Sequence, residues 1–364
     1  MGLWYCVRQP WNLKFYYLAL MQKTFTVFYL TILYLTISGA HAQSFRGLAP
    51  LNDTVCWVSG SRGTVIKTEN GGVNWDTISP AGFSTKEFRD IHVYDHKHAL
   101  LMSSGEKAVI LSTRDGGKSW QTVHSNNRPG VFYDAMDAFG PFVAVIGDPY
   151  KPDGMDHLVF DMLLSCDSGN TWTCDYVQTW KGFWEADSGE AFFAASGTNL
   201  ILDYKGTFHP ETFEPKKLRF SMVSGGSNPR LYMNGIRIGL GFDKGPSSGA
   251  YGHARASNSR MVIVGGDYTK PEDREKNCLY YDRKSQGYLT PEVPPNGYRS
   301  GVAEFNNGQL WVCTGTNGTD ISKDDGKTWM PLPLQGYNSC AFSSNYLWLC
   351  GDKGRVLRVA APTG

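Results

Sequence analysis

The stretch STRDGGKSW, residues 112–120, contains the pattern that decides the fold. Its last eight residues run from a hydroxyl side chain through an acid and two glycines to a tryptophan. Four octets, at residues 68–75, 113–120, 165–172 and 322–329, share a hydroxyl at the first position, Asp or Asn at the third, glycine at the fifth and tryptophan at the eighth. The first three tryptophans lie 45 and 52 residues apart, and the last gap of 157 residues is about three times as long. This period is typical of propeller blades rather than of helical repeats.

The chemistry of the octet predicts a tight turn. An Asp or Asn at the third position can accept hydrogen bonds from backbone N–H groups two residues on. The glycine at the fifth position can adopt a positive φ without a Cβ clash. The tryptophan begins the next strand and can cover the turn with its ring. These residues are therefore predicted to be structural rather than catalytic: Asn70, Asp115, Asp167, Asp324, Trp75, Trp120, Trp172 and Trp329.

Whole repeats align around the octets and predict an all-β propeller. Residues 45–75, 88–120 and 298–329 share one strand layout, and residues 337–360 supply three strands and stop. Less regular blades are predicted at 132–177, 185–240 and 250–295, with AFFAASG (191–197) and RMVIVGGDY (260–268) as strands. About 46 residues per unit predicts seven four-stranded blades with the last incomplete, and six or eight blades are the alternatives.

The N-terminal region has the features of a leader peptide. From Met21 it reads MQKTFTVFYLTILYLTISGAHAQ, with Lys23 as the charged start and Ala40-His41-Ala42 as a small-x-small cleavage site. We expect cleavage after Ala42, a periplasmic or secreted mature chain of one domain at 43–364, and no membrane span after cleavage. Residues 1–20 are interpreted as a disordered start-site extension. An uncleaved membrane anchor is the alternative.

Composition and motifs exclude several classes of function. A net charge of +1 gives no reason to expect nucleic acid as a partner. No nucleotide-binding glycine loop is present, so no cofactor is predicted. The cysteines lack metal-ligand spacing, and His92, His96 and His98 fall on a predicted strand and turn, so no metal is predicted. The pairs Cys166/Cys174 and Cys313/Cys350 are either reduced thiols or disulfides.

The octets resemble the bacterial-neuraminidase repeat, or Asp-box. With GTVIKTENGGVNW (63–75), FRDI (88–91), RPGVFYDAMD (128–137), GEAFFAASGT (189–198) and GGDYTKP (265–271), the chain is more similar to photosystem II stability/assembly factor-like propellers. A subgroup of that family consists of exported bacterial proteins labelled oxidoreductase or glycosyl hydrolase. The resemblance implies a propeller but not one function, because such propellers include sialidases, other glycosidases and binding scaffolds.

Arginines predict a candidate ligand site. Arg46, Arg89 and Arg299 each follow an aromatic residue at the start of a predicted inner strand, and inner strands begin on one face of the ring. Three guanidiniums at one channel mouth would bind a carboxylate, sulfate or phosphate. Further candidates for the same face are Asp90, Tyr133 and Tyr268. The alternative is that each arginine pairs with a local acid and ties neighbouring blades together.

The sequence favours an exported, non-catalytic scaffold that binds a protein partner or an anionic extracellular or periplasmic glycan. The alternative is a glycoside hydrolase of the sialidase-like or another Asp-box kind, for which Asp134 and Glu190 are the candidate carboxyls. A sialidase would carry Arg-Ile-Pro in its first blade, by the resemblance, whereas this chain has Arg46-Gly47-Leu48. That difference counts against sialidase activity.

Overall fold

The computed structural model describes residues 43–172, 185–205, 217–233, 235–256 and 260–362. All of these residues belong to one compact unit, Leu33–Gly364. The predicted start-site extension and leader lie outside the described residues. Within the described ranges, no helix is long and apolar enough to cross a membrane.

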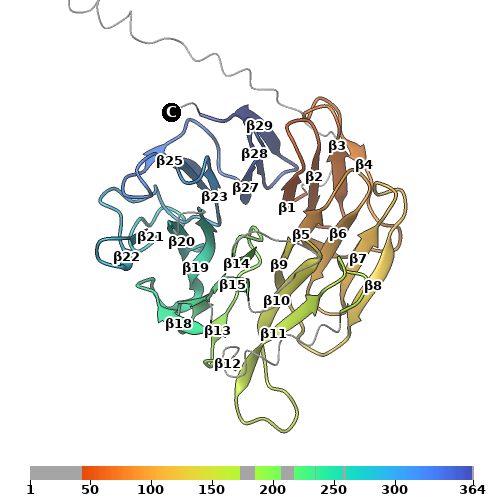
Figure 1. The fold of residues 1–364 in the computed structure, drawn as a ribbon, viewed down its shortest axis with the longest axis horizontal. Coiled ribbons are helices and arrows are strands. Elements are labelled where there is room, and N and C mark those ends of the chain that lie inside the picture. Colours follow the sequence, from red (N-terminus) through yellow and green to blue (C-terminus); the bar gives the residue numbers. More distant parts are fainter. Residues whose placement is uncertain (1–42, 173–184, 206–216, 234, 257–259, 363–364) are drawn as a thin grey trace, which may run out of the picture. The chain divides into compact units, whose positions relative to one another are not determined.

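The described strands form seven antiparallel sheets, which are the blades of a propeller (Figure 1). Blade 1 consists of β1 (Phe45–Pro50), β2 (Cys56–Gly60), β3 (Val65–Thr68) and β4 (Asp76–Thr77). Blade 2 consists of β5 (Glu87–Val93), β6 (Ala99–Ser104), β7 (Ala108–Thr113) and β8 (Gln121–Asn126). Blade 3 consists of β9 (Tyr133–Phe139), β10 (Phe142–Tyr150), β11 (Leu158–Ser165) and β12 (Glu185–Ala186).

The second half of the chain supplies four more blades. Blade 4 consists of β14 (Leu200–Tyr204), β15 (Leu218–Val223), β17 (Arg230–Met233) and β18 (Ile236–Gly239). Blade 5 consists of β19 (Gly245–Arg255), β20 (Met261–Asp267), β21 (Cys278–Asp282) and β22 (Gly287–Leu289), extended by β16 (Gly225–Gly226) and β13 (Glu190–Ala191). Blade 6 consists of β23 (Gly301–Phe305), β24 (Leu310–Gly315), β25 (Gly318–Ser322) and β26 (Met330–Pro331). Blade 7 has three strands, β27 (Ser339–Phe342), β28 (Tyr346–Cys350) and β29 (Val356–Ala360), so the predicted seven-blade fold with an incomplete last blade is confirmed.

The hydrophobic core is divided among the interfaces between blades. Strand β6 shows why, because both of its faces are buried: Ala99 and Leu101 pack toward blade 1, whereas Leu100 and Met102 pack toward blade 3. Equivalent apolar clusters fill each successive interface, and the one between blades 7 and 1 contains Trp348. Each blade is therefore stabilised by two neighbours. The ring must close for the facing sides of blade 7 and blade 1 to be buried.

Closure of the ring depends on loop contacts rather than on a shared strand among the described residues. Ser44 forms an isolated antiparallel bridge with Asp352 and donates its hydroxyl to that carboxylate at 2.6 Å. Asn338 donates to the carbonyl of Phe45 at 3.0 Å. Residues from opposite ends of the domain thus hold blade 7 against blade 1.

The four octets form turns in which the side chains hydrogen-bond within their own loop. In the second octet, Asp115 accepts hydrogen bonds from the backbone N–H and the hydroxyl of Ser119, at 2.9 and 2.6 Å. The backbone donor lies four residues on in all four turns, not two as expected, because the fourth and fifth positions both adopt positive φ. The hydroxyl at the first position accepts from the glycine N–H at the fifth, as Thr113 does from Gly117.

The octet tryptophans pack against the preceding blade. The Trp120 ring meets Trp57 of blade 1 edge to face at 6.4 Å and donates its Nε1–H to the carbonyl of Ile78. Trp75 meets Trp348 of blade 7 in the same way at 6.3 Å. The expectation that these rings cover their own turns is therefore incomplete, because Trp75 and Trp120 also pack against the neighbouring blade.

Three sequence expectations about the irregular blades are wrong. The fourth strand of blade 3 lies at Glu185–Ala186, beyond the predicted end at 177. Blade 4 begins at Leu200 rather than at 185. The predicted strand 191–197 is not a strand beyond Ala191, because the following residues leave the sheet and enter the centre of the ring.

Candidate functional site

Residues 192–199, called the plug here, fill the centre of the ring. Their backbone and side chains are bound by residues of inner strands on opposite sides. From blade 7, Ser339 donates to the carbonyl of Ser196 at 3.2 Å, and the Ser196 hydroxyl donates to the carbonyl of Ser300 at 2.7 Å. From blade 5, the backbone N–H of His253 donates to the carbonyl of Thr198 at 2.8 Å. The channel expected at the axis is thus occupied by the protein's own chain.

Two of the predicted arginines bind the plug. Arg46 donates to the carbonyl of Ala195 at 3.3 Å, and Arg89 donates to the carbonyl of Ala194 at 2.9 Å. Both residues lie at register shifts in their inner strands, β1 and β5, where an extra residue redirects the side chain. Arg46 and Arg89 therefore occupy equivalent positions in blades 1 and 2, as predicted.

The two guanidiniums lie close enough to affect each other. Burial, followed by the neighbouring Arg46 charge, lowers the pKa of Arg89 to about 10, while Glu87 and Asp134 act in the opposite direction. The nearest carboxylate oxygen to Arg89 is that of Glu87, at 3.9 Å from Nε. The buried Nε of Arg89 has no hydrogen-bond partner among the described residues. Arg46 and Arg89 therefore form a cationic pair with unused donor capacity.

Arg299 does not join that pair. Its side chain is 1% exposed and forms a salt bridge with Asp320, whose side chain is equally buried. Nε donates to the Asp320 carboxylate at 2.7 Å, and NH1 donates to the side chain of Asn317 at 2.6 Å. This residue pairs with a local acid, as the alternative from the sequence supposed, but Asp320 lies in β25 of the same blade, so the pair does not tie neighbouring blades together.

The acids at the inner strands are linked to the backbone of the next blade. Asp90 accepts from the N–H groups of Ile91 and Met136, both at 2.9 Å. Asp137 accepts in the same way from Ala138 at 2.8 Å and from Leu202 at 2.7 Å. Burial raises the pKa of Asp90 to about 7 and that of Asp137 to about 6, because the charged carboxylate loses its water.

The candidate carboxyls for glycoside hydrolysis lie in different settings. Glu190 accepts hydrogen bonds from Ser224 and Tyr232 at 2.5 and 2.7 Å and forms a salt bridge with Arg230 at 2.7 Å. Asp134 is fully buried, and burial together with the nearby Asp148 carboxyl holds its pKa well above the usual range. Glu190 is thus tied to blade 4 by its own neighbours rather than presented to a cleft.

The two predicted tyrosines are separated by their exposure. Tyr133 is fully buried between blades 2 and 3, where His124 and Asn126 hydrogen-bond its hydroxyl. Tyr268 is 52% exposed after β20. Of the two, only Tyr268 has the exposure needed to contact a partner.

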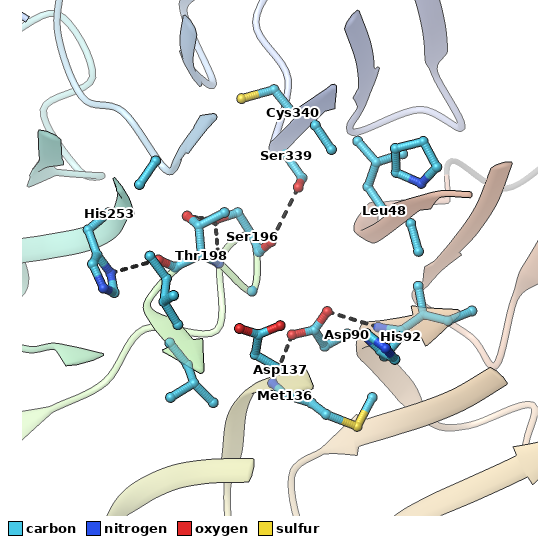
Figure 2. Close-up of a pocket in the computed structure, with 18 of the residues that line it drawn as sticks. Leu48, Asp90, His92, Met136, Asp137, Ser196, Thr198, His253, Ser339 and Cys340 are labelled. Carbon is cyan, nitrogen blue, oxygen red and sulfur yellow. Dashed lines mark hydrogen bonds between the residues drawn. The ribbon is translucent and has the colours of Figure 1, made fainter. Parts of the chain in front are cut away.

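A cavity of about 420 Å³ adjoins the plug. Figure 2 shows Asp90, Asp137 and His92 on one side of this cavity and Ser196, Thr198 and His253 across from them. Burial lowers the pKa of His92 to about 4 and that of His253 to about 3, so both rings are neutral at physiological pH. No group of three His, Cys, Asp or Glu side chains in the described ranges is arranged to hold a metal ion.

Sequence reasoning missed the aromatic residues that hold the plug. The Phe193 ring stacks on Tyr251 with centroids 4.1 Å apart, and Tyr251 meets Tyr298 edge to face at 4.8 Å. Tyr251 lies at a register shift in β19 that matches those of Arg46 and Arg89. An alignment of the inner strands in the sequence could have identified Tyr251, because it would have placed this residue at the position that Arg46 and Arg89 occupy in their blades.

The cysteines divide into thiols and a disulfide. Cys56, Cys278, Cys313, Cys340 and Cys350 are free and buried, so Cys313 and Cys350 are not bridged. Cys166 is disulfide-bonded, and Cys174 lies outside the described residues.

The comparisons with known proteins agree with this geometry. Residues 42–146, which cover blades 1 and 2 and the start of blade 3, match the family model for Photosynthesis system II assembly factor YCF48. This part of the chain is thus similar to the photosystem II assembly factor family, and the chain as a whole has the β-propeller fold. No curated protein gives a significant match to its sequence.

Solved structures of YCF48 and of other propellers share the fold of this chain. The structure of YCF48 bound to D1 peptide matches with a TM-score of 0.56 and 16% identity over 88% of this chain and 97% of that chain. YCF48 from Cyanidioschyzon merolae matches with a TM-score of 0.54 and 15% identity over 88% and 96%. The WD40 propeller domain of Doa1 matches with a TM-score of 0.52 and 13% identity over 89% and 95%. At these identities the likeness is one of fold.

Proposed function

We propose that the protein is an exported, non-catalytic scaffold that binds an acidic segment of a protein partner at the Arg46–Arg89 pair. The observation that carries this proposal is the close approach of two guanidiniums that bind only backbone carbonyls of the plug and have no ion pair shorter than 3.9 Å among the described residues. A carboxylate placed between them would relieve their repulsion and use their remaining N–H donors.

The plug supports a binding role rather than a catalytic one. It anchors both arginines through the carbonyls of Ala194 and Ala195, so their side chains are ordered before a partner arrives. Preorganised side chains lose less conformational entropy on binding. Glu190, one of the two candidate carboxyls, is held by three neighbouring side chains rather than presented to a substrate.

The choice of a protein over a glycan follows from the relatives. YCF48 has been solved with a D1 peptide bound, so a propeller of similar fold takes a peptide ligand. Export of this chain follows from its leader-like residues 21–42, with a mature chain beginning at Gln43. The function proposed is therefore that of an assembly-factor-like protein acting outside the cytoplasm.

Replacing both arginines by alanine tests the proposal. The mature chain and the Arg46→Ala/Arg89→Ala variant would be used to capture proteins from the envelope fraction of the producing cells, with bound proteins identified by mass spectrometry. We expect capture to fall at least tenfold, because each hydrogen bond to a charged group contributes about 1.5–3 kcal/mol. The matched control is Arg62→Ala/Lys118→Ala, which removes the same charge from two exposed turns.

Two results would contradict the proposal. One is equal capture by the arginine variant and the control. The other is binding to acidic oligosaccharides on a glycan array without selective capture of any protein, which would assign the arginine pair to a glycan.

A further inference from the structure

The outer edge of blade 7 is open. In blades 1 to 6 the third strand pairs with a fourth, whereas β29 has a neighbour on one side only among the described residues. Figure 1 shows β29 at the periphery of its blade, outside β28 and β27. An unpaired edge strand presents a row of backbone donors and acceptors that can template another strand.

The register of β28 and β29 shows which groups face outward. Ala361 N–H donates to the carbonyl of Asn345 at 2.8 Å, and Gly351 N–H donates to the carbonyl of Arg355 at 3.0 Å. These bonds place the hydrogen-bonded pairs of the ladder at the odd-numbered residues of β29. Because antiparallel strands alternate the direction of their backbone groups, the N–H and C=O of Val356, Arg358 and Ala360 point away from β28.

The filled positions in other blades define what fits this edge. The fourth strands β4, β12 and β26 are two residues long, β22 has three residues, β18 has four and β8 has six. The side chains of β4 and β26 are exposed. The fourth position of a blade therefore accepts a short extended segment, held mainly by its backbone rather than by burial of apolar side chains.

Charge selects among possible occupants. Lys353, Arg355 and Arg358 lie within residues 353–362, which contain no acid. None of the three forms an ion pair within 4 Å among the described residues, and the Arg358 guanidinium instead stacks on Tyr346 at 4.1 Å and donates to the carbonyl of Asp53. A second copy of the chain would bring these cations against one another, which destabilises strand pairing. An acidic segment would complement them.

We infer that β29 binds an extended acidic segment of a partner protein as the fourth strand of blade 7. This inference rests on the scaffold function proposed above and adds a second contact, separate from the Arg46–Arg89 pair. The partner strand exchanges backbone hydrogen bonds with Val356, Arg358 and Ala360, and its carboxylates face Lys353 and Arg358, whereas Arg355 is bound to Gln335 and Gly336. Main-chain pairing supplies affinity, and the charge pattern supplies selectivity.

The probe is an acetylated and amidated heptapeptide in which glutamate alternates with threonine or valine. Amide-resolved hydrogen exchange of the mature chain is measured with this peptide and with a matched peptide carrying lysine in place of glutamate. We expect the acidic peptide to protect the amides of Val356, Arg358 and Ala360, and the basic peptide to leave them unchanged. Equal protection by both peptides, or protection confined to other strands, would overturn the inference.

Two substitutions separate the backbone contact from the charge contact. Ala360→Pro removes an N–H that does not bond to β28, so the blade keeps its ladder while peptide binding weakens about fivefold. Ala360→Ser keeps the N–H and is the matched control, with unchanged binding. Arg358→Gln keeps the backbone donor and weakens binding roughly two- to fivefold. Unchanged affinity in both Ala360→Pro and Arg358→Gln would exclude the edge as the site.

Partner capture distinguishes this inference from the proposed function. If the arginine-pair variant loses the partner while Ala360→Pro retains it, the scaffold function stands and strand addition is wrong. If Ala360→Pro loses the partner while the arginine-pair variant retains it, strand addition is supported and the arginine contact is wrong.

Discussion

The buried pair of Arg299 and Asp320 gives the sharpest test of the structure. Asp320→Ala would leave the Arg299 guanidinium 1% exposed and without its carboxylate, retaining only the carbonyl of Tyr298 and the amide of Asn317 as acceptors. Removing one partner of a buried ion pair costs about 3–5 kcal/mol, because the remaining charge has neither water nor a counterion. Arg299→Met/Asp320→Leu removes both charges and fills the space with apolar atoms, so we expect it to cost less than the single change.

Urea unfolding of the mature chain followed by tryptophan fluorescence would measure these costs, with thermal unfolding as a second reading. At about 2–4 °C per kcal/mol for a large domain, Asp320→Ala should lower Tm by roughly 6–20 °C. A loss below about 1 kcal/mol for Asp320→Ala would refute the reasoning, since it would mean that Arg299 reaches solvent. A double variant as unstable as the sum of its single changes would refute it as well, because the two side chains would then not interact.

Three further predictions concern the plug, the inner-strand acids and the thiols. Burial raises the pKa of Asp90 to about 7, so the proton bound in the folded state stabilises the protein below about pH 4, and this contribution is lost as the pH rises through 7. Between these pH values the unfolding free energy of the parent should fall by on the order of 4 kcal/mol more than that of Asp90→Asn. Equal dependence of the two unfolding free energies on pH would contradict the raised pKa of Asp90. Gly197→Ala should destabilise the protein by at least 1–2 kcal/mol in chemical denaturation, because Gly197 has a φ of 78° and a Cβ added there would lie 2.5 Å from the Asp90 carboxylate. An unchanged denaturant midpoint would show that the plug adapts to the added methyl group. Burial raises the pKa of Cys56, Cys278, Cys313, Cys340 and Cys350, the free thiols in the described part of the chain. A thiol reagent should therefore leave them unmodified in the native protein and react with them in denaturant, and rapid native labelling of any one would contradict its burial.

The repeated octets made the blade count accessible from the sequence. Each octet specifies its own turn within eight residues, as the bonds from Ser119 and Thr113 to Asp115 show. The spacing of these turns then fixed the length of a blade, and division of the mature chain gave seven blades. Where the octet is missing, in blade 4, the predicted start was wrong, because alternating apolar residues alone do not distinguish a strand from an apolar segment such as 191–197 that enters the centre of the ring.

The sequence by itself determined the turns, the blades and the equivalent positions of Arg46 and Arg89. Only the tertiary structure decided what those arginines bind, since Ala195 and Ala194 lie 149 and 105 residues further along the chain. It also decided that Arg299, at a similar place in its repeat, turns to Asp320. The physical reason is range: a turn is specified by hydrogen bonds between residues four apart, whereas the partners at the axis of a ring are fixed only when all seven blades have packed and the last has closed against the first.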